Sequence, residues 1–395
     1  MTATSVNLSD PVAAAASLSS RIADCAERTE RERRVPDETI AALYDAGLYH
    51  YLVPKRWGGQ DGSLIKQIEV AAEIAKSCSA TAWVYMITAN IGAFAAAYLS
   101  EDGARAIHEA TVRPVVCGVN GFTGSARAGG ENEYVVSGSW GFASGCLNAN
   151  WFMGGVLVLD ENGEMVDQGW AFVPMSQLEI KDTWHVAGMK GTGSNTVVAT
   201  DLVVPKHLVM FMTDRLGHEA QFHPEDETMD RMPFAALFST ALMGPSLGMA
   251  QALLEKVTAA SHNRGISYFD FNRQTDSGAL LERLGKAALD IDTAWLHIRR
   301  SAHELEDTTR TQTLDYATRA RCRADAAQAA EHVRAAVDSL LSIAGASSFA
   351  DSNPIQRLWR DINMATRHAF LNSGPIFEAY GRAYAGVEPN ITVYI

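Results

Sequence analysis

Cysteine is scarce and unpaired in this 395-residue chain. The five cysteines are Cys25, Cys78, Cys117, Cys146 and Cys322. No two of them have the spacing of a metal site or a redox pair, and an odd, scattered set is typical of a reduced protein with buried thiols. We therefore expect a cytoplasmic protein that does not depend on disulfides.

Motifs for nucleotide and metal chemistry are also missing. The chain has no P-loop and no His-Glu-x-x-His or comparable cluster, so no metal site is expected. Residues 191–194 read Gly-Thr-Gly-Ser, but no strand-turn-helix unit of the right length follows them. A binding site for NAD(P)H is therefore not expected in this chain.

Basic residues are outnumbered by acidic ones, 33 to 46, which gives a net charge of −13. This balance repels phosphate backbones and anionic membranes, so neither nucleic acid nor a membrane is an expected partner. Residues 79–99 carry no charge and could span a bilayer by length, yet they include polar residues and many alanines. No second such segment is evident, so a buried helix is predicted. Residues 1–10 lack the pattern of a secretory signal.

Three segments differ in their hydrophobic pattern. Residues 1–112 have helical spacing, residues 113–228 contain short strand-like runs without helices between them, and residues 229–395 return to helices. The order predicts an α+β protein with an N-terminal helical domain, a central antiparallel β domain and a C-terminal helical bundle. Glu161, Asn162 and Gly163 predict a hairpin turn. The expected long helices cover residues 236–260, 277–300, 314–343 and 356–380.

One aromatic and glycine-rich run could line a cofactor site. Trp140 and Phe142 stand beside glycines and Ser144, so they could form a flat wall with one hydroxyl group. A flavin ring needs such a wall and a hydrogen-bond donor near its reactive nitrogen, a role expected of the Ser144 hydroxyl. The alternative is an ordinary strand end with core aromatic residues.

Taken together, the motifs resemble the acyl-CoA dehydrogenase superfamily. The likeness rests on the helix–β–helix order, residues 140–145, residues 182–194, and Arg360-Asp361 before His368, and it extends over residues 15–390. It is nearest to the branch of two-component flavin-dependent monooxygenases. The fold is therefore expected to be acyl-CoA dehydrogenase-like.

This resemblance implies roles for particular residues. His368 matches the histidine that acts as a base on the substrate, and Ser144 matches the serine that hydrogen-bonds the flavin near N5. The other implied cofactor contacts are Trp140, Phe142, Thr192, Gly193, Ser194, Arg264, Gly345 and Ala346, the last three reaching a cofactor across a subunit interface. Trp83, Asn90 and His368 are expected to line the substrate pocket.

The implied activity is hydroxylation of a phenolic or indolic substrate through a C4a-hydroperoxyflavin. Reduced FAD, with FMN as the alternative, would come from a separate NAD(P)H-dependent flavin reductase, and O2 is the co-substrate. A homodimer or homotetramer is expected. The other enzyme hypothesis is a flavin-dependent acyl-CoA dehydrogenase, which needs a carboxylate base; residues 233–251 contain no Asp or Glu. A helical binding protein without flavin affinity is the non-enzymatic hypothesis.

Overall fold

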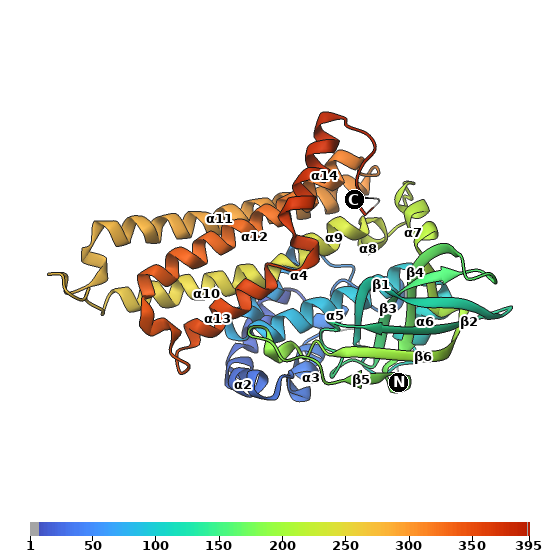
Figure 1. The fold of residues 1–395 in the computed structure, drawn as a ribbon, viewed down its shortest axis with the longest axis horizontal. Coiled ribbons are helices and arrows are strands. Elements are labelled where there is room, and N and C mark those ends of the chain that lie inside the picture. The colour runs from blue at the N-terminus through green and yellow to red at the C-terminus, as the bar shows by residue number, and fades with distance from the viewer. Residues whose placement is uncertain (1–7, 393) are drawn as a thin grey trace.

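The structure, a computed structural model, describes residues 8–392, 394 and 395. Its N-terminal part is helical, as predicted. The helices are α1 (Pro11–Ser17), α2 (Ser19–Glu32), α3 (Asp37–Asp45), α4 (Leu64–Ser77), α5 (Ser79–Tyr98) and α6 (Glu101–His108), with 3-10 turns η1 (Leu48–His50) and η2 (Lys55–Trp57). Helix α5 lies at the centre, where it packs against β1 on one side and against α4 and α10 on others (Figure 1).

Two helical segments are long and apolar enough to cross a membrane by length and composition, Ser79–Tyr98 and Phe234–Ser261. The sequence-based expectation of only one such segment was therefore wrong. In the fold, 89% of the apolar window of each is buried, so both are core helices, which confirms the buried helix predicted at residues 79–99. The five cysteines, all in the described part of the chain, are free, and Cys25 is only half-buried.

Seven strands form one sheet in the order β5-β6-β2-β1-β3-β4-β7. They are β1 (Val116–Gly130), β2 (Glu133–Trp140), β3 (Trp151–Leu159), β4 (Met165–Pro174), β5 (Glu179–Lys181), β6 (Thr196–Pro205) and β7 (Val209–Phe211). The predicted hairpin is confirmed: β3 and β4 pair in antiparallel around Gly163, whose φ is +84°.

The prediction of a wholly antiparallel sheet was wrong. Strands β1 and β3 pair in parallel, whereas the other pairs that the structure describes are antiparallel. The physical reason is a crossover: β2 pairs with one edge of β1, and residues 141–150 then carry the chain to the opposite edge. A tight hairpin joins two antiparallel strands. Parallel neighbours therefore need a longer connection that crosses from one edge of the sheet to the other.

The C-terminal part is a bundle that extends away from the sheet (Figure 1). Helix α7 (Met212–Glu219) follows β7 and packs against β4 and β7. The helices after it are α8 (Thr228–Arg231), α9 (Phe234–Ala241), α10 (Met243–Ser261), α11 (Gly278–Asp307), α12 (Tyr316–Ala344), α13 (Pro354–Ala365) and α14 (Ser373–Ala385). Two expected helices are interrupted: residues 236–260 at Leu242, and residues 356–380 between α13 and α14. Pro375 is the third residue of α14, and it accounts for a helix start there because proline is tolerated in the first turn but not further inside a helix.

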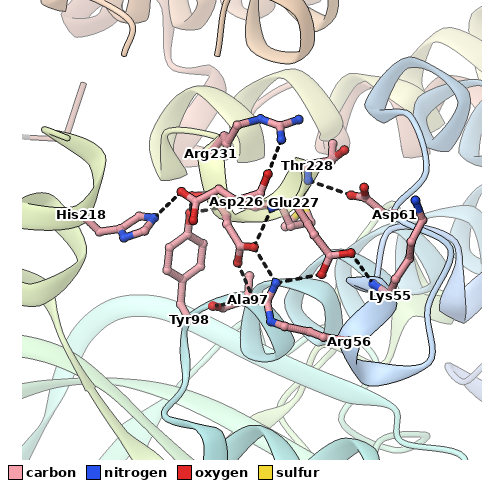
Figure 2. A network of polar contacts seen from close by, with 12 residues as sticks. Lys55, Arg56, Asp61, Ala97, Tyr98, His218, Asp226, Glu227, Thr228 and Arg231 are labelled. Carbon is pink, nitrogen blue, oxygen red and sulfur yellow. Dashed lines mark hydrogen bonds and ion pairs between the residues drawn. The ribbon is translucent and has the colours of Figure 1, made fainter. Parts of the chain in front are cut away.

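A polar network ties the start of α9 to the N-terminal part (Figure 2). Arg56 of η2 donates two hydrogen bonds of 2.6 Å to the carboxylate of Asp230 on α8 and one of 2.9 Å to Glu227. Asp61 accepts a hydrogen bond of 2.7 Å from the backbone N–H of Thr228. The network thereby fixes where α9 begins, next to the aromatic cluster described below. The domain limits 1–112, 113–228 and 229–395 stay predictions, and residues 1–7 lie outside the described part.

Candidate active site

The crossover loop between β2 and β3 presents one aromatic ring and buries one hydroxyl. Phe142 has φ +63° and is 73% exposed, with its ring edge-on to Trp184 at a centroid distance of 5.4 Å. A bulky residue with positive φ is strained, and an exposed ring gains little from burial, so fold stability does not account for Phe142. Two residues later, Ser144 turns inward and is buried.

Trp140 lies behind this loop rather than on its open face. Its ring is 1% exposed, and its Nε1–H donates to the carbonyl oxygen of Gly155 at 2.8 Å. Side-chain atoms on Gly124 or Gly138 would collide with the ring, so the glycines make room for it. The expected wall therefore consists of Phe142, and Trp140 supports the strand from which the loop starts.

Ser144 belongs to a buried chain of hydrogen bonds. Its Oγ lies 3.1 Å from Nε1 of Trp83 on α5 and 2.8 Å from Oγ of Ser194. Ser194 Oγ lies 2.6 Å from Oγ1 of Thr192, which in turn donates to the carbonyl oxygen of Met189 at 2.9 Å. The structure therefore brings together four of the predicted site residues from three distant parts of the sequence.

The loop that carries Thr192 and Ser194 is held in an unusual backbone conformation. Met189 and Gly193 have φ values of +53° and +54°, on either side of the 3-10 turn η4 (Lys190–Thr192). A side chain at Gly193 would meet the carbonyl oxygen of Arg33 at 2.8 Å. Glycine at this position is thus required by both the backbone angle and the close approach.

Asp361 of α13 anchors this loop, a role that the sequence did not suggest. Its carboxylate accepts a hydrogen bond of 2.5 Å from the backbone N–H of Met189 and another from the hydroxyl of Ser79, at the start of α5. Burial raises the pKa of Asp361, an effect that the two hydrogen bonds partly offset. Beside it, Gly188 packs so closely that a Cβ would lie 2.3 Å from the carbonyl oxygen of Arg360. The Arg360-Asp361 pair was noted as a motif, but only the tertiary contacts show what it holds.

His368 lies in the turn after α13, not on a helix as expected. Its imidazole lies beside Trp83, with ring centroids 5.8 Å apart, and is stacked with Phe370 at 5.9 Å. Nδ1 accepts a hydrogen bond of 3.2 Å from the backbone N–H of Phe370, as in an N-cap. Burial lowers the pKa of His368 to about 4. The ring is therefore neutral at pH 7, and its single proton is on Nε2.

Aromatic rings continue from His368 back to α5. Phe370 contacts Phe234 of α9 at a centroid distance of 6.2 Å, and Phe234 contacts Phe94 of α5 at 5.2 Å. Asn90 precedes Phe94 by one turn of α5 and is 0% exposed. Within the described part of the chain, neither amide atom of Asn90 has a hydrogen-bond partner. Because buried polar groups are normally paired, this amide marks a place for a polar ligand atom.

The remaining predicted residues form a separate cluster. Arg264 follows α10, and its guanidinium donates to the carbonyl oxygen of Ala344 at the end of α12. Gly345, with φ +71°, lies against the same guanidinium, and Ala346 begins η8 (Ala346–Phe349). These residues follow the C-terminal ends of α10 and α12, and both helix ends lie at the end of the bundle that points away from the sheet (Figure 1). One chain therefore does not bring Arg264 to Ser144.

Comparison with known proteins gives this geometry a family. The model of the acyl-CoA dehydrogenase N-terminal domain matches residues 12–118, and that of the acyl-CoA dehydrogenase C-terminal domain matches residues 240–373. The chain is 31% identical over 387 residues to the flavin-dependent monooxygenase oxygenase subunit HsaA of Mycobacterium tuberculosis, covering 97% of both chains. The chain belongs to the acyl-CoA dehydrogenase superfamily, in its branch of flavin-dependent monooxygenase oxygenase subunits.

Two further relatives support this assignment within the superfamily. The oxygenase component of the FADH2-dependent resorcinol hydroxylase of a Rhizobium species is 29% identical over 382 residues, with 92% of this chain and 91% of that protein covered. XiaF from a Streptomyces species, solved with FADH2 and glycerol, superposes with a TM-score of 0.92 at 32% identity, covering 97% of this chain and 96% of XiaF. The superfamily fold, with its mixed sheet between two helical parts, is thereby confirmed.

Features of this chain fit a flavin ring. The exposed, strained Phe142 offers a flat apolar surface beside the crossover loop, and the Ser144 hydroxyl lies two residues away. The left-handed backbone at Gly193 brings main-chain groups close to the hydroxyl chain. Stacking surface, hydroxyl and close backbone approach are what an isoalloxazine with polar edges requires.

Proposed function

We propose that this chain is the oxygenase component of a two-component flavin-dependent monooxygenase that hydroxylates a phenolic or indolic substrate. The observation that carries the proposal is the buried hydroxyl chain at Ser144, flanked by exposed Phe142 and by Trp83, which lies beside His368. Bound reduced flavin would supply the electrons and the position at which dioxygen is activated. Since the sequence has no dinucleotide motif, a separate NAD(P)H-dependent reductase would supply that flavin.

Phe142, Ser144, Thr192, Gly193 and Ser194 would hold the flavin ring, and Trp140 would support them from behind. Reduced FAD is the proposed form, with FMN as the alternative. The argument for FAD is the second cluster, Arg264 with Gly345 and Ala346, whose cation suits a diphosphate. Because the cluster lies at the far end of the bundle, it would serve the cofactor of a second copy. The proposed enzyme is therefore a homodimer or homotetramer.

His368 would act on the polar group of the substrate. As a base it would have to take up a proton on Nδ1, which already accepts from Phe370, and burial lowers its pKa to about 4. We therefore propose that neutral His368 donates from Nε2 to the oxygen of a phenolic substrate. A hydrogen bond donated to the phenol oxygen would stabilise the phenolate that forms when the phenol loses its proton to water, and the phenolate makes the ring a better carbon nucleophile. This revises the expectation that His368 is the base.

Asn90 would provide a second polar contact for the substrate. Its buried amide offers both a donor and an acceptor that have no partner among the described residues. Trp83 and Asn90 are seven residues apart on α5, about 10 Å along the helix axis. An aromatic substrate between Trp83 and Phe94 would thus be gripped by its rings and oriented by its polar group.

An anaerobic titration with reduced FAD and FMN, followed by an oxygen pulse in the presence of phenolic and indolic compounds, tests the proposal. We expect tight binding of reduced flavin and hydroxylated product from at least one compound. An acyl-CoA dehydrogenase would instead show bleaching of oxidised flavin by an acyl-CoA. With the productive compound, His368→Ala should lower the hydroxylation rate at saturating reduced flavin by about 100-fold. A rate within twofold of wild type would contradict the role of His368.

A further inference from the structure

The hydrogen-bond chain at Ser144 has donors and acceptors that can be counted. At one end, the indole N–H of Trp83 can only donate; at the other, the carbonyl of Met189 can only accept. Between them lie three hydroxyls, each with one proton: Ser144, Ser194 and Thr192. All three are buried, with exposures of 7%, 1% and 3%. Bulk water is therefore poorly placed to replace any partner.

The two ends fix the direction of every proton. Thr192 donates to Met189, so it must accept from Ser194. Ser194 then has no proton left for Ser144, so Ser144 donates to Ser194. Ser144 also accepts from Trp83, which leaves one lone pair and no proton for a ligand. Towards a bound molecule, Ser144 is therefore an acceptor, which revises the expectation that its hydroxyl is a donor.

We propose that Thr192 is a positioning residue that, through Ser194, makes Ser144 an acceptor and so favours reduced over oxidised flavin. This inference rests on the proposed function. Reduced flavin carries a proton on N5 and can donate to Ser144, whereas N5 of oxidised flavin is an acceptor and faces a lone pair. For Ser144 to donate to oxidised flavin, every hydrogen bond between the three hydroxyls would have to reverse its direction. Thr192 would then lose its hydrogen bond to Met189.

The free-energy preference for reduced over oxidised flavin should equal the net contribution of about one neutral hydrogen bond. Net contributions of such bonds correspond to roughly a three- to tenfold ratio of dissociation constants. For a two-electron couple, a tenfold ratio is about 30 mV, so the chain should raise the midpoint potential of the bound flavin by about 15–30 mV. Both quantities can be measured without turnover.

Thr192→Val removes the anchor while keeping the shape of the side chain. The Met189 carbonyl still accepts from Trp184 Nε1 at 3.1 Å, and Ser194 still has Ser144 as a partner, so the variant leaves neither without a hydrogen bond. Ser194 can then donate to Ser144, and Ser144 can donate to oxidised flavin. Thr192→Ser keeps the hydroxyl and serves as the matched control.

The experiment measures dissociation constants of oxidised FAD and anaerobically reduced FAD, and the midpoint potential of the bound flavin. We expect Thr192→Val to lower the ratio of oxidised to reduced constants three- to tenfold and the potential by about 15–30 mV, while Thr192→Ser matches wild type. In a Ser144→Ala background, Thr192→Val should change neither the ratio of dissociation constants nor the midpoint potential, because the effect passes through Ser144. A ratio in Thr192→Val within 1.5-fold of wild type, roughly half the smallest expected effect, overturns the inference. A wild-type chain that binds neither form refutes the proposed function as well.

Discussion

The half-buried His368 should make the stability of this protein depend on pH in a defined window. Burial lowers the pKa of His368 from 6.5 to about 4. Between these values the unfolded chain binds a proton that the folded chain does not. The free energy of unfolding therefore falls as pH drops from about 6.5 to about 4 and is fully retained above 6.5.

The size of this effect follows from the difference in pKa. At about 1.4 kcal/mol for each tenfold change in proton affinity, the full contribution is about 3 kcal/mol. Between pH 7 and pH 5, wild type should lose about 2 kcal/mol through this one group. His108 has a pKa lowered likewise to about 4 by burial, but it is present in both wild type and variant, so its contribution cancels.

His368→Asn is the suitable perturbation. Asparagine can accept the hydrogen bond from the backbone N–H of Phe370, as an N-cap residue does, but it does not titrate. Urea unfolding at fixed protein concentration, at pH 7 and pH 5, should show a loss about 2 kcal/mol smaller in the variant. His303→Asn, on an exposed face of α11, controls for the removal of a histidine.

The same variant identifies the His368 signal in an NMR titration of histidine-labelled protein. The resonance that disappears in His368→Asn should titrate with a midpoint near 4. A midpoint near 6.5 would show that the ring is hydrated. Equal pH dependence of wild type and variant in the unfolding experiment would refute the reasoning equally well, and with it the neutral donor role proposed for His368.

Three further predictions concern other parts of the chain. Asn90→Leu removes an unpaired buried amide, so it should raise the free energy of unfolding by about 1–2 kcal/mol while raising KM for the aromatic substrate about tenfold; unchanged KM would exclude Asn90 from the pocket. Arg56→Met leaves the buried Asp230 carboxylate without its main partner and should cost about 2 kcal/mol in urea unfolding, whereas a loss under 0.5 would make the network dispensable. Arg264→Ala should weaken reduced FAD about tenfold, and reduced FMN less; equal losses would remove the argument for a diphosphate.

Features of the fold that depend on neighbouring residues could be predicted from the sequence. The β3–β4 hairpin follows from Gly163 and its flanking strands, and the helical texture before residue 112 follows from apolar spacing. The break before α14 could also have been predicted, because Pro375 stands inside the expected helix. The earlier end of α13 at Ala365 is not explained by Pro375, so His368 was expected on a helix, although the residue caps the turn that follows α13.

Features that depend on distant contacts could not be predicted. Asp361 lies on an amphipathic helix like many other acidic residues, and nothing around it in sequence points to the backbone of Met189, 172 residues away. The unpaired state of Asn90 is likewise a property of what surrounds α5. The family resemblance pointed to Ser144 and Thr192 as cofactor contacts. Which hydroxyl donates to which follows only from the partners at the two ends of the hydrogen-bond chain, Trp83 and Met189.

The parallel pairing of β1 with β3 and the position of Ser144 have the same cause. To reach the far edge of β1, residues 141–150 must cross α5, and Gly145 passes so close that a Cβ would lie 3.0 Å from Val84 and 3.2 Å from Thr88. That approach places Ser144 within hydrogen-bond distance of Trp83. In an antiparallel sheet joined by a short hairpin, the loop would stay on its own side of β1 and this contact would be lost. The expectation of an antiparallel sheet therefore missed the crossover at residues 141–150, which is the connection that brings Ser144 to Trp83.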